Sequence, residues 1–142
     1  MVVQNPTYDS LDLRELEMTS ILLIDDGVGL RAESQALMDA PDLIVTPARN
    51  GAEAVREVLE TDFDVIICNM EMSQMPGEMF YRAVERVKPA LCKRFIFIAD
   101  AATTRRAEDF IENVEGLLLF KPVKISHLMR MVTLAAARGR TV

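Results

Sequence analysis

The stretch that decides the fold is FDVIICNMEMSQMPG, residues 63–77. It contains a short apolar run at 65–68, rich in β-branched residues, and the polar residue Asn69 follows at once. A loop with Pro76 and Gly77 comes next. A continuous apolar run of this length between turn residues predicts a strand buried on both faces of a sheet. In a parallel α/β sheet, functional groups gather just beyond the carboxyl ends of the strands, so we expect chemistry at Asn69.

On both sides of this stretch, strand-like apolar runs alternate with amphipathic stretches. Strands are expected at residues 21–24, 43–46, 64–69, 95–99 and 117–120. Helices are expected at residues 29–39, 51–60, 77–87, 103–113 and 124–138. Strict alternation predicts an α/β fold, a doubly wound parallel sheet with helices on both faces. Because crossovers are right-handed, we expect a flavodoxin-like (βα)5 architecture with five strands in the order 2-1-3-4-5.

The spacing of apolar residues also predicts which side of each helix faces the core. The residues expected to point inward are Leu30, Leu37 and Met38; Ala54, Val55, Val58 and Leu59; Phe80, Val84 and Val87; Ala107, Phe110, Ile111 and Val114; and Ile125, Leu128, Met129, Val132 and Ala136. Asn50 is expected to cap the second helix, with Glu53 completing a capping box.

Composition bounds the class of protein. The chain has 142 residues, 50% of them apolar and 27% charged, as in an ordinary single soluble domain. A net charge of −6 argues against nucleic-acid binding, and no apolar run is long enough to span a membrane. We expect a tail with a short helix over residues 1–18, a folded domain over 19–138 and a tail over 139–142. Cys68 and Cys92 form no paired motif, which favours reduced thiols and a cytoplasmic location.

In the expected strand order, four strands open onto one rim of the sheet. The residues placed there are Asp25 and Asp26 after the first strand, Asn69 after the third, Ala99 and Asp100 at the end of the fourth, and Lys121, just before Pro122, after the fifth. Adjacent acids after a first strand, together with a lysine before a proline after a fifth, form a specific pair of signals.

At this point the sequence resembles the receiver domain of two-component response regulators. The stretches that carry the resemblance are ILLIDD (21–26), FDVIICNMEMSQMPG (63–77), RFIFIADA (94–101) and LLLFKPV (117–123). They occur in the order and spacing of the family, over roughly residues 19–138. The resemblance implies signal transduction through a phosphorelay with a histidine kinase or a downstream effector as the protein partner.

The resemblance also implies roles for the rim residues. In the family, an aspartate at the end of the third strand accepts a phosphoryl group, and acids after the first strand hold Mg²⁺. A hydroxyl residue after the fourth strand and a lysine after the fifth contact the phosphoryl oxygens, and an aromatic residue in the fifth strand reports the switch. Carried over, the metal and acidic pocket is Asp25, Asp26 and the backbone carbonyl of Glu71, and the lysine is Lys121. The acceptor, hydroxyl and aromatic positions hold Asn69, Ala99 and Leu118.

These departures have physical consequences. An amide oxygen is neutral and far less nucleophilic than a carboxylate, so Asn69 is not expected to accept a phosphoryl group. Mg²⁺ prefers anionic oxygens, so its affinity is expected to be weak, and no cofactor is certain. Ala99 has no hydroxyl to couple charge to conformation. The sequence therefore predicts an atypical pseudo-receiver, not an enzyme, that acts by protein–protein interaction.

Alternatives remain open from the sequence. The domain could accept phosphate on a displaced carboxylate such as Glu71, or it could be an engineered, inactive Asp-to-Asn variant. A third hypothesis is a small-molecule sensor that takes an anion beside Lys121. The resemblance further suggests a homodimer through the fourth helix, fifth strand and fifth helix, and no nucleic-acid or membrane partner is expected.

Overall fold

The computed structural model describes residues 18–27, 30–72, 74–100 and 104–140. The short helix expected near residues 9–17 lies outside the described residues, as does most of the predicted N-terminal tail. Among the described helices, none combines the length and the apolar character that crossing a bilayer requires.

Five parallel strands form one sheet, as predicted. They are β1 (Thr19–Ile24), β2 (Leu43–Ala48), β3 (Val65–Asn69), β4 (Phe95–Ala99) and β5 (Leu117–Phe120), and their order in the sheet is β2-β1-β3-β4-β5. β1 begins two residues earlier than expected and β2 ends two residues later, so that β2 includes Pro47. Because β2 is at the edge of the sheet, a residue without an N–H group is tolerated there.

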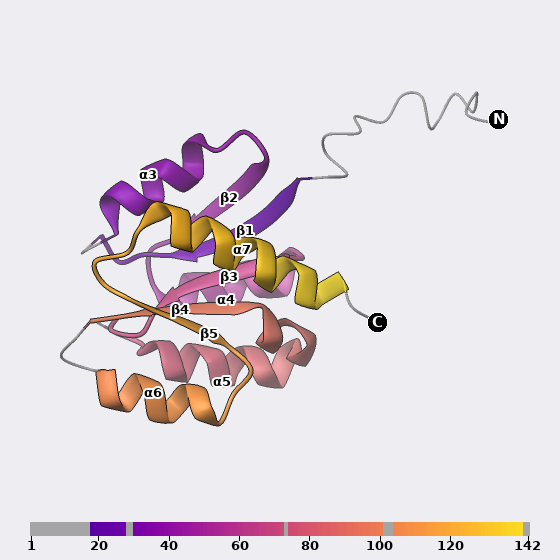
Figure 1. Ribbon diagram of the computed structural model, residues 1–142. Helices are drawn as coiled ribbons and strands as arrows, with labels where there is room; N and C mark the ends of the chain where they lie inside the picture. Colours follow the sequence, from indigo (N-terminus) through magenta and orange to yellow (C-terminus); the bar gives the residue numbers. More distant parts are fainter. Residues whose placement is uncertain (1–17, 28–29, 73, 101–103, 141–142) are drawn as a thin grey trace.

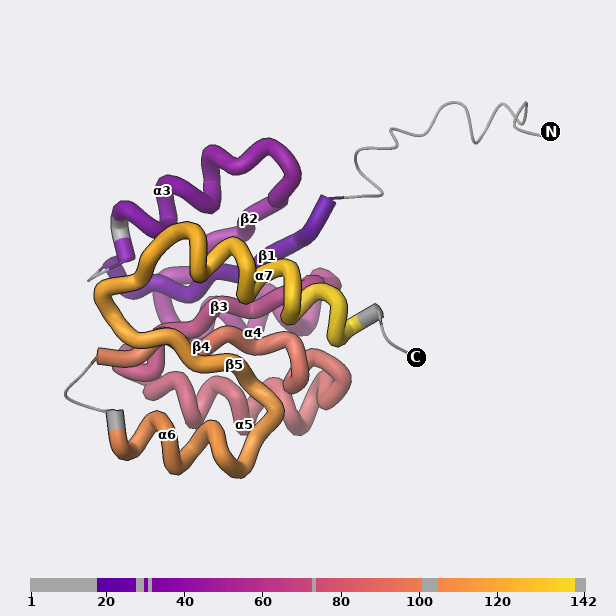
Figure 2. The backbone as a smooth tube through the Cα atoms, in the orientation of Figure 1, coloured from indigo at the N-terminus to yellow at the C-terminus, as the bar shows by residue number. Residues whose placement is uncertain are grey.

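Helices cover both faces of the sheet (Figures 1 and 2). The helices are α3 (Arg31–Asp39), α4 (Gly51–Glu60), α5 (Gly77–Val87), α6 (Thr104–Glu112) and α7 (Ile125–Arg140), with a 3-10 helix, η2 (Pro89–Arg94), before β4. α3 and α7 lie on one face and α4, α5 and α6 on the other. The flavodoxin-like doubly wound fold is therefore confirmed, and η2 is the one described helix that the apolar spacing did not predict.

Two apolar layers hold the helices to the sheet. Alternate residues of the strands point to opposite faces, so Ile21 and Leu23 join the layer under α3 and α7, and Leu22 and Ile24 join the layer under α4, α5 and α6. All five residues of β3 are buried. Burial on both faces explains why its sequence is continuously apolar until its last residue.

Three predicted core residues are exposed. Met38, Leu59 and Val87 have exposed fractions of 43%, 57% and 45%. Each lies in the last turn of its helix, beyond the last residue of that helix that packs in the core, so the predictions for these three residues are wrong. Conversely, Tyr81 is buried although it was not predicted, because its ring packs edge-on against Phe95.

The other residues predicted to face the core are all at least partly buried. Most of the other helix positions are fully buried, whereas Val55, Ile111, Val114, Ile125 and Met129 are partly buried. Partial burial is expected where an apolar stripe meets the edge of a sheet.

The N-terminal cap of α4 forms as predicted, but only half of the capping box does. The side-chain oxygen of Asn50 accepts a hydrogen bond from the backbone N–H of Glu53 at 2.8 Å. The carboxylate of Glu53 accepts from the backbone N–H of Arg49, at 3.2 Å, rather than from that of Asn50. The bond from the backbone to the carboxylate of Glu53 is therefore made one residue closer to the N-terminus than in a standard capping box.

Arg94 fastens the C-terminal end of α7 to the start of β3. Its guanidinium donates to the carbonyl oxygen of Phe63 at 3.0 Å and to that of Gly139 at 3.2 Å. A side chain at residue 139 would overlap this guanidinium, which explains the glycine. Arg138 adds a second link by donating to the carbonyl oxygen of Lys93 at 3.3 Å.

Gly77 allows the start of α5 to approach the end of the central strand closely. A Cβ atom at this position would lie 2.6 Å from the backbone oxygen of Asn69 and 3.0 Å from the Cα atom of Met70. Backbone cannot move aside as a flexible side chain can. We predict that Gly77→Ala lowers the free energy of unfolding by about 1–3 kcal/mol, measured by urea denaturation.

Gly51→Ala is the matched control, because Gly51 is also the first residue of a helix. The nearest atoms to a Cβ atom there belong to the side chain of Met75, its Sδ at 2.5 Å and its Cβ at 2.9 Å, so relief requires a shift of the loop that carries Met75 and leaves the central strand in place. We expect a smaller loss of stability than in Gly77→Ala, because this loop yields more easily than the buried strand. Equal losses in the two variants would contradict the role assigned to Gly77.

Candidate functional site

Asn69 ends β3 at the rim and is enclosed by the protein. Its exposed fraction is 1%, and it is the only buried polar or charged residue among the described residues. The thiol of Cys68 donates to its backbone oxygen at 3.3 Å, and the N–H of Gly77 donates to the carbonyl of Met70 at 3.0 Å. These backbone contacts fix the end of the strand against the start of α5.

The side-chain amide of Asn69 has no hydrogen-bond partner. Neither its oxygen nor its nitrogen is bonded to any described residue. A buried polar group without a partner costs about 1–3 kcal/mol. Such a cost in the middle of a well-packed sheet marks the end of β3 as the candidate functional site, where sequence reasoning also placed it.

Asp25 and Asp26 follow β1 at the same rim and are half-buried. One carboxylate oxygen of Asp25 accepts from the N–H of Gly27 at 3.0 Å, and the other accepts from the hydroxyl of Ser34 at 3.1 Å. Gly27 has a φ of 93°, a conformation that favours glycine. The turn after β1 therefore already uses both oxygens of Asp25 to hold its own shape and to fix α3.

A second network joins the loops after β3, β4 and β5. The backbone N–H of Asp100 donates to a carboxylate oxygen of Glu71 at 3.0 Å. The ammonium of Lys121 lies 3.3 Å from a carboxylate oxygen of Asp100, and its backbone N–H donates to the carbonyl of Ala99 at 2.9 Å. Sequence reasoning placed Asp100 on the rim but did not predict that it would pair with Lys121.

The two remaining site positions lie in the packed core. Ala99 is fully buried, and Leu118 is partly buried beside Phe97, its neighbour in the register of the sheet. Neither residue offers a polar atom to the rim. The positions of a hydroxyl and of an aromatic switch are thus filled by groups that can only pack.

The donor set at this rim fits a divalent metal poorly. Within the described ranges, no three side chains of the His, Cys, Asp and Glu types are placed to hold one ion. Both oxygens of Asp25 are engaged within its own turn and with Ser34, and an amide stands at position 69. Mg²⁺ is usually held by one or two carboxylates together with water, so the engagement of Asp25 and the missing charge at position 69 both weaken this site.

Comparison with known proteins gives the family. Residues 21–133 match the family model of the response regulator receiver domain. The chain belongs to the receiver domain family. Its place is therefore in two-component signalling, a function that the fold and the rim had suggested.

The curated relatives of this receiver domain are longer proteins. It is 23% identical over 136 residues to the transcriptional regulatory protein ZraR of Escherichia coli K12, covering 96% of this chain and 29% of that protein. It is 29% identical over 104 residues to a protein-glutamate methylesterase/protein-glutamine glutaminase of Nitrobacter winogradskyi, covering 70% of this chain and 23% of the relative. The receiver domain thus spans less than a third of either relative.

Solved structures show the same fold. A receiver domain protein from Clostridium thermocellum superposes with a TM-score of 0.77 at 22% identity, covering 87% of this chain and 98% of that one. A response regulator receiver protein from Sinorhizobium medicae superposes with a TM-score of 0.70 at 23% identity, covering 87% and 98%. At these identities the likeness concerns the fold alone.

The unpartnered amide of Asn69 generates a test of the site. Leucine has nearly the same shape as asparagine but no polar atoms, so Asn69→Leu removes the cost of the two unbonded atoms. We predict that this substitution raises the free energy of unfolding by about 1–3 kcal/mol in urea denaturation. Most substitutions of buried residues destabilise, so a gain would be specific evidence, and a loss would contradict the description of the amide.

Asn69→Asp is the opposite change at the same position. Burial raises the pKa of the new carboxyl above its value of about 4 in the unfolded chain. The folded state then holds the proton more tightly, so stability is greatest below about pH 4 and falls as the pH rises through the folded-state pKa. Urea denaturation at several pH values between 4 and 8 measures how the free energy of unfolding falls with pH. The unaltered chain is the reference, because the amide of Asn69 does not titrate.

Proposed function

We propose that this receiver domain does not undergo phosphorylation at residue 69 and acts instead by binding other proteins in one fixed conformation. The observation that carries the proposal is the buried amide of Asn69 at the acceptor position. A carboxylate oxygen can attack phosphorus and form an acyl phosphate. The neutral amide oxygen is a much poorer nucleophile, so the covalent step has no group to start from.

The pairing of Lys121 with Asp100 supports the same proposal. In a receiver that follows the family pattern, the lysine contacts the phosphoryl oxygens. Here its ammonium lies 3.3 Å from Asp100, and the N–H of Asp100 is bonded to Glu71. The loops after β3, β4 and β5 are therefore already linked without a phosphoryl group, and Ala99 supplies no hydroxyl that could respond to one.

The alternative acceptor, Glu71, is used structurally. One of its carboxylate oxygens accepts the N–H of Asp100, and this bond ties the loop after β3 to the end of β4. Transfer of a phosphoryl group to Glu71 would break that tie. We therefore assign Glu71 to positioning the loops, and phosphorylation there is an outcome that the experiment below can detect.

The partners proposed are proteins, either a histidine kinase or a downstream effector. A homodimer through α6, β5 and α7 is part of the proposal by analogy with the family. Phe120, at the end of β5, leaves 37% of its surface exposed and would contribute apolar contact there. No enzymatic activity is proposed for this domain.

Incubation with acetyl phosphate and Mg²⁺, followed by intact mass measurement, tests the proposal. We expect no phosphoryl adduct on the unaltered chain, because no carboxylate occupies the acceptor position. Asn69→Asp is the positive control, since it supplies both the nucleophile and a third carboxylate for the metal. An adduct on the unaltered chain would defeat the proposal, and peptide mapping would show whether Glu71 carries it.

A second prediction separates labelling from switching. We expect Asn69→Asp to be phosphorylated without a change of structure away from the rim, because Ala99 cannot bond a phosphoryl oxygen. Adding Ala99→Thr to that variant restores the hydroxyl, so phosphorylation should then shift amide resonances in α6 and β5. Nuclear magnetic resonance spectra of both phosphorylated variants make the comparison. Identical spectral changes in the two would show that Ala99 does not block switching.

A further inference from the structure

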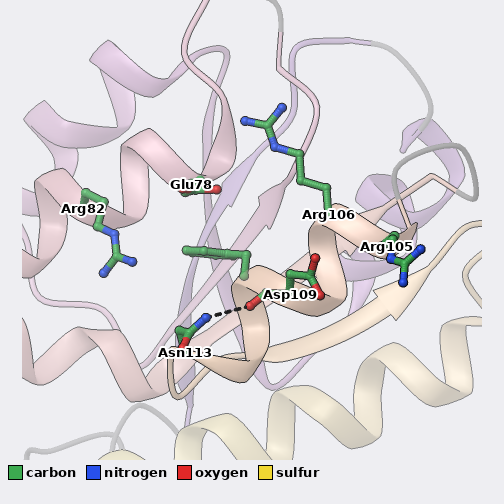
Figure 3. Close-up of a pocket in the computed structure, with 7 residues that line it drawn as sticks. Glu78, Arg82, Arg105, Arg106, Asp109 and Asn113 are labelled. Carbon is green, nitrogen blue, oxygen red and sulfur yellow. Dashed lines mark hydrogen bonds between the residues drawn. The ribbon is translucent and has the colours of Figure 1, made fainter.

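A groove runs between α5 and α6, on the surface of the layer opposite α3 and α7. It encloses about 660 Å³ and is lined by Glu78 and Arg82 of α5, by Arg105, Arg106, Asp109 and Phe110 of α6, and by Asn113 just beyond α6. Figure 3 shows the two residues of α5 facing Arg106, Asp109 and Asn113 across the groove, with Arg105 on the side of α6 away from α5. Phe110 forms the floor and is itself buried.

Most of the charged side chains of this groove have no partner among the described residues. Glu78, Arg105, Arg106 and Asp109 form no side-chain hydrogen bond or ion pair with any described residue. Arg82 pairs only with Glu85 of its own helix, at 3.2 Å. Since three arginines face two acids, the lining as a whole is positive.

Two of the arginines stand at the end of α6 that disfavours positive charge. Arg105 and Arg106 lie in the first turn of α6, which holds no acidic residue. Cations at this end of a helix oppose the helix dipole, which favours negative charge there. A local arrangement that costs stability without an evident compensation is typical of a binding surface.

The guanidinium of Arg82 is positioned by aromatic rings at the floor of the groove. Its guanidinium carbon lies 5.5 Å from the ring centre of Tyr81 and 5.7 Å from that of Phe110. Both rings are buried and pack edge-on against each other. Stacking on aromatic faces orients the planar guanidinium and reduces the entropy lost when it binds a carboxylate.

From these observations we infer that the groove between α5 and α6 docks an acidic segment of a partner protein. Six of the seven side chains that line this open groove end in a charged or amide group, so the groove recognises a partner by its charges. The lining residues of α6 extend from Arg105 to Phe110, about 8 Å along the helix axis, and Asn113 just past the helix lengthens the groove. Arginine binds carboxylates through two parallel hydrogen bonds, so carboxylates of the partner would pair with Arg82, Arg105 and Arg106.

The two acids of the groove determine which segments fit. Glu78 and Asp109 stand among the arginines and would repel carboxylates placed opposite them. A partner must therefore match the order of charges along the groove, and a uniformly acidic segment would be disfavoured. Repulsive elements of this kind give specificity rather than affinity.

The groove continues toward the rim. A smaller hollow of about 170 Å³ shares Glu78 and Arg106 with it and reaches Glu71, whose carboxylate holds the N–H of Asp100. A bound segment would thus lie beside the loops after β3 and β4, which Glu71 and Asp100 link to each other. The inference rests on the proposed function in one respect, namely that the domain acts by binding proteins.

Selection of peptides from a random 16-residue display library against the full chain tests the inference. We expect the enriched peptides to carry two or more acidic residues, and we expect Arg82→Ala and Arg106→Ala each to weaken their binding by about tenfold or more. Arg56→Ala is the matched control, because Arg56 is an exposed arginine on α4, outside the groove. Asp109→Asn should strengthen binding, since it removes a repulsive charge.

Other outcomes overturn the inference. Enriched peptides without acidic residues, or affinities that Arg82→Ala and Arg56→Ala change equally, would exclude the groove as an acidic docking site. Inorganic tripolyphosphate that binds more tightly than every selected peptide, with the same dependence on Arg82 and Arg106, would assign the groove to a small anion instead. The phosphorylation assay is independent of these results, so failure here leaves the proposed function intact, and the reverse also holds.

Discussion

The constraint on which the structure depends is the burial of β3 on both faces. Every residue of this strand is buried, and the strand lies between β1 and β4 in the middle of the sheet. Its last residue is therefore inside the protein even though it stands at the rim. Any polar group at position 69 is removed from water, and its chemistry is decided by what the neighbouring loops offer. On one side lies the turn after β1, which the carboxylate of Asp25 holds in shape. On the other side Glu71, Asp100 and Lys121 are linked to one another.

The fold was predictable because its signals are local. Continuous apolar runs identify buried strands, and the alternation with amphipathic stretches leaves few topologies. Errors occurred where the environment depends on how far a helix extends past the sheet: Met38, Leu59 and Val87 follow the helical spacing but lie in terminal turns. Tyr81 was missed for the converse reason, since its burial depends on rings from β4 and α6.

The candidate site was predictable in its position but not in its bonding. Parallel strands bring their carboxyl ends to one edge, so the sequence alone places Asn69, Asp25 and Lys121 on the rim. Which partner a long side chain selects depends on loop conformation, and Lys121 pairs with Asp100 rather than with the acids after β1. The groove between α5 and α6 could not be foreseen either, because its lining comes from two helices that meet only in the folded chain, where Phe110 packs against Tyr81.

The bonds of Arg94 have a mechanical consequence. One guanidinium joins the carbonyl of Phe63, just before β3, to the carbonyl of Gly139, near the end of α7. Tension applied to the last turn of α7 would be transmitted through these bonds to the centre of the sheet, instead of peeling the helix from its surface. The end of α7 and the strand that carries Asn69 would therefore resist such a pull together.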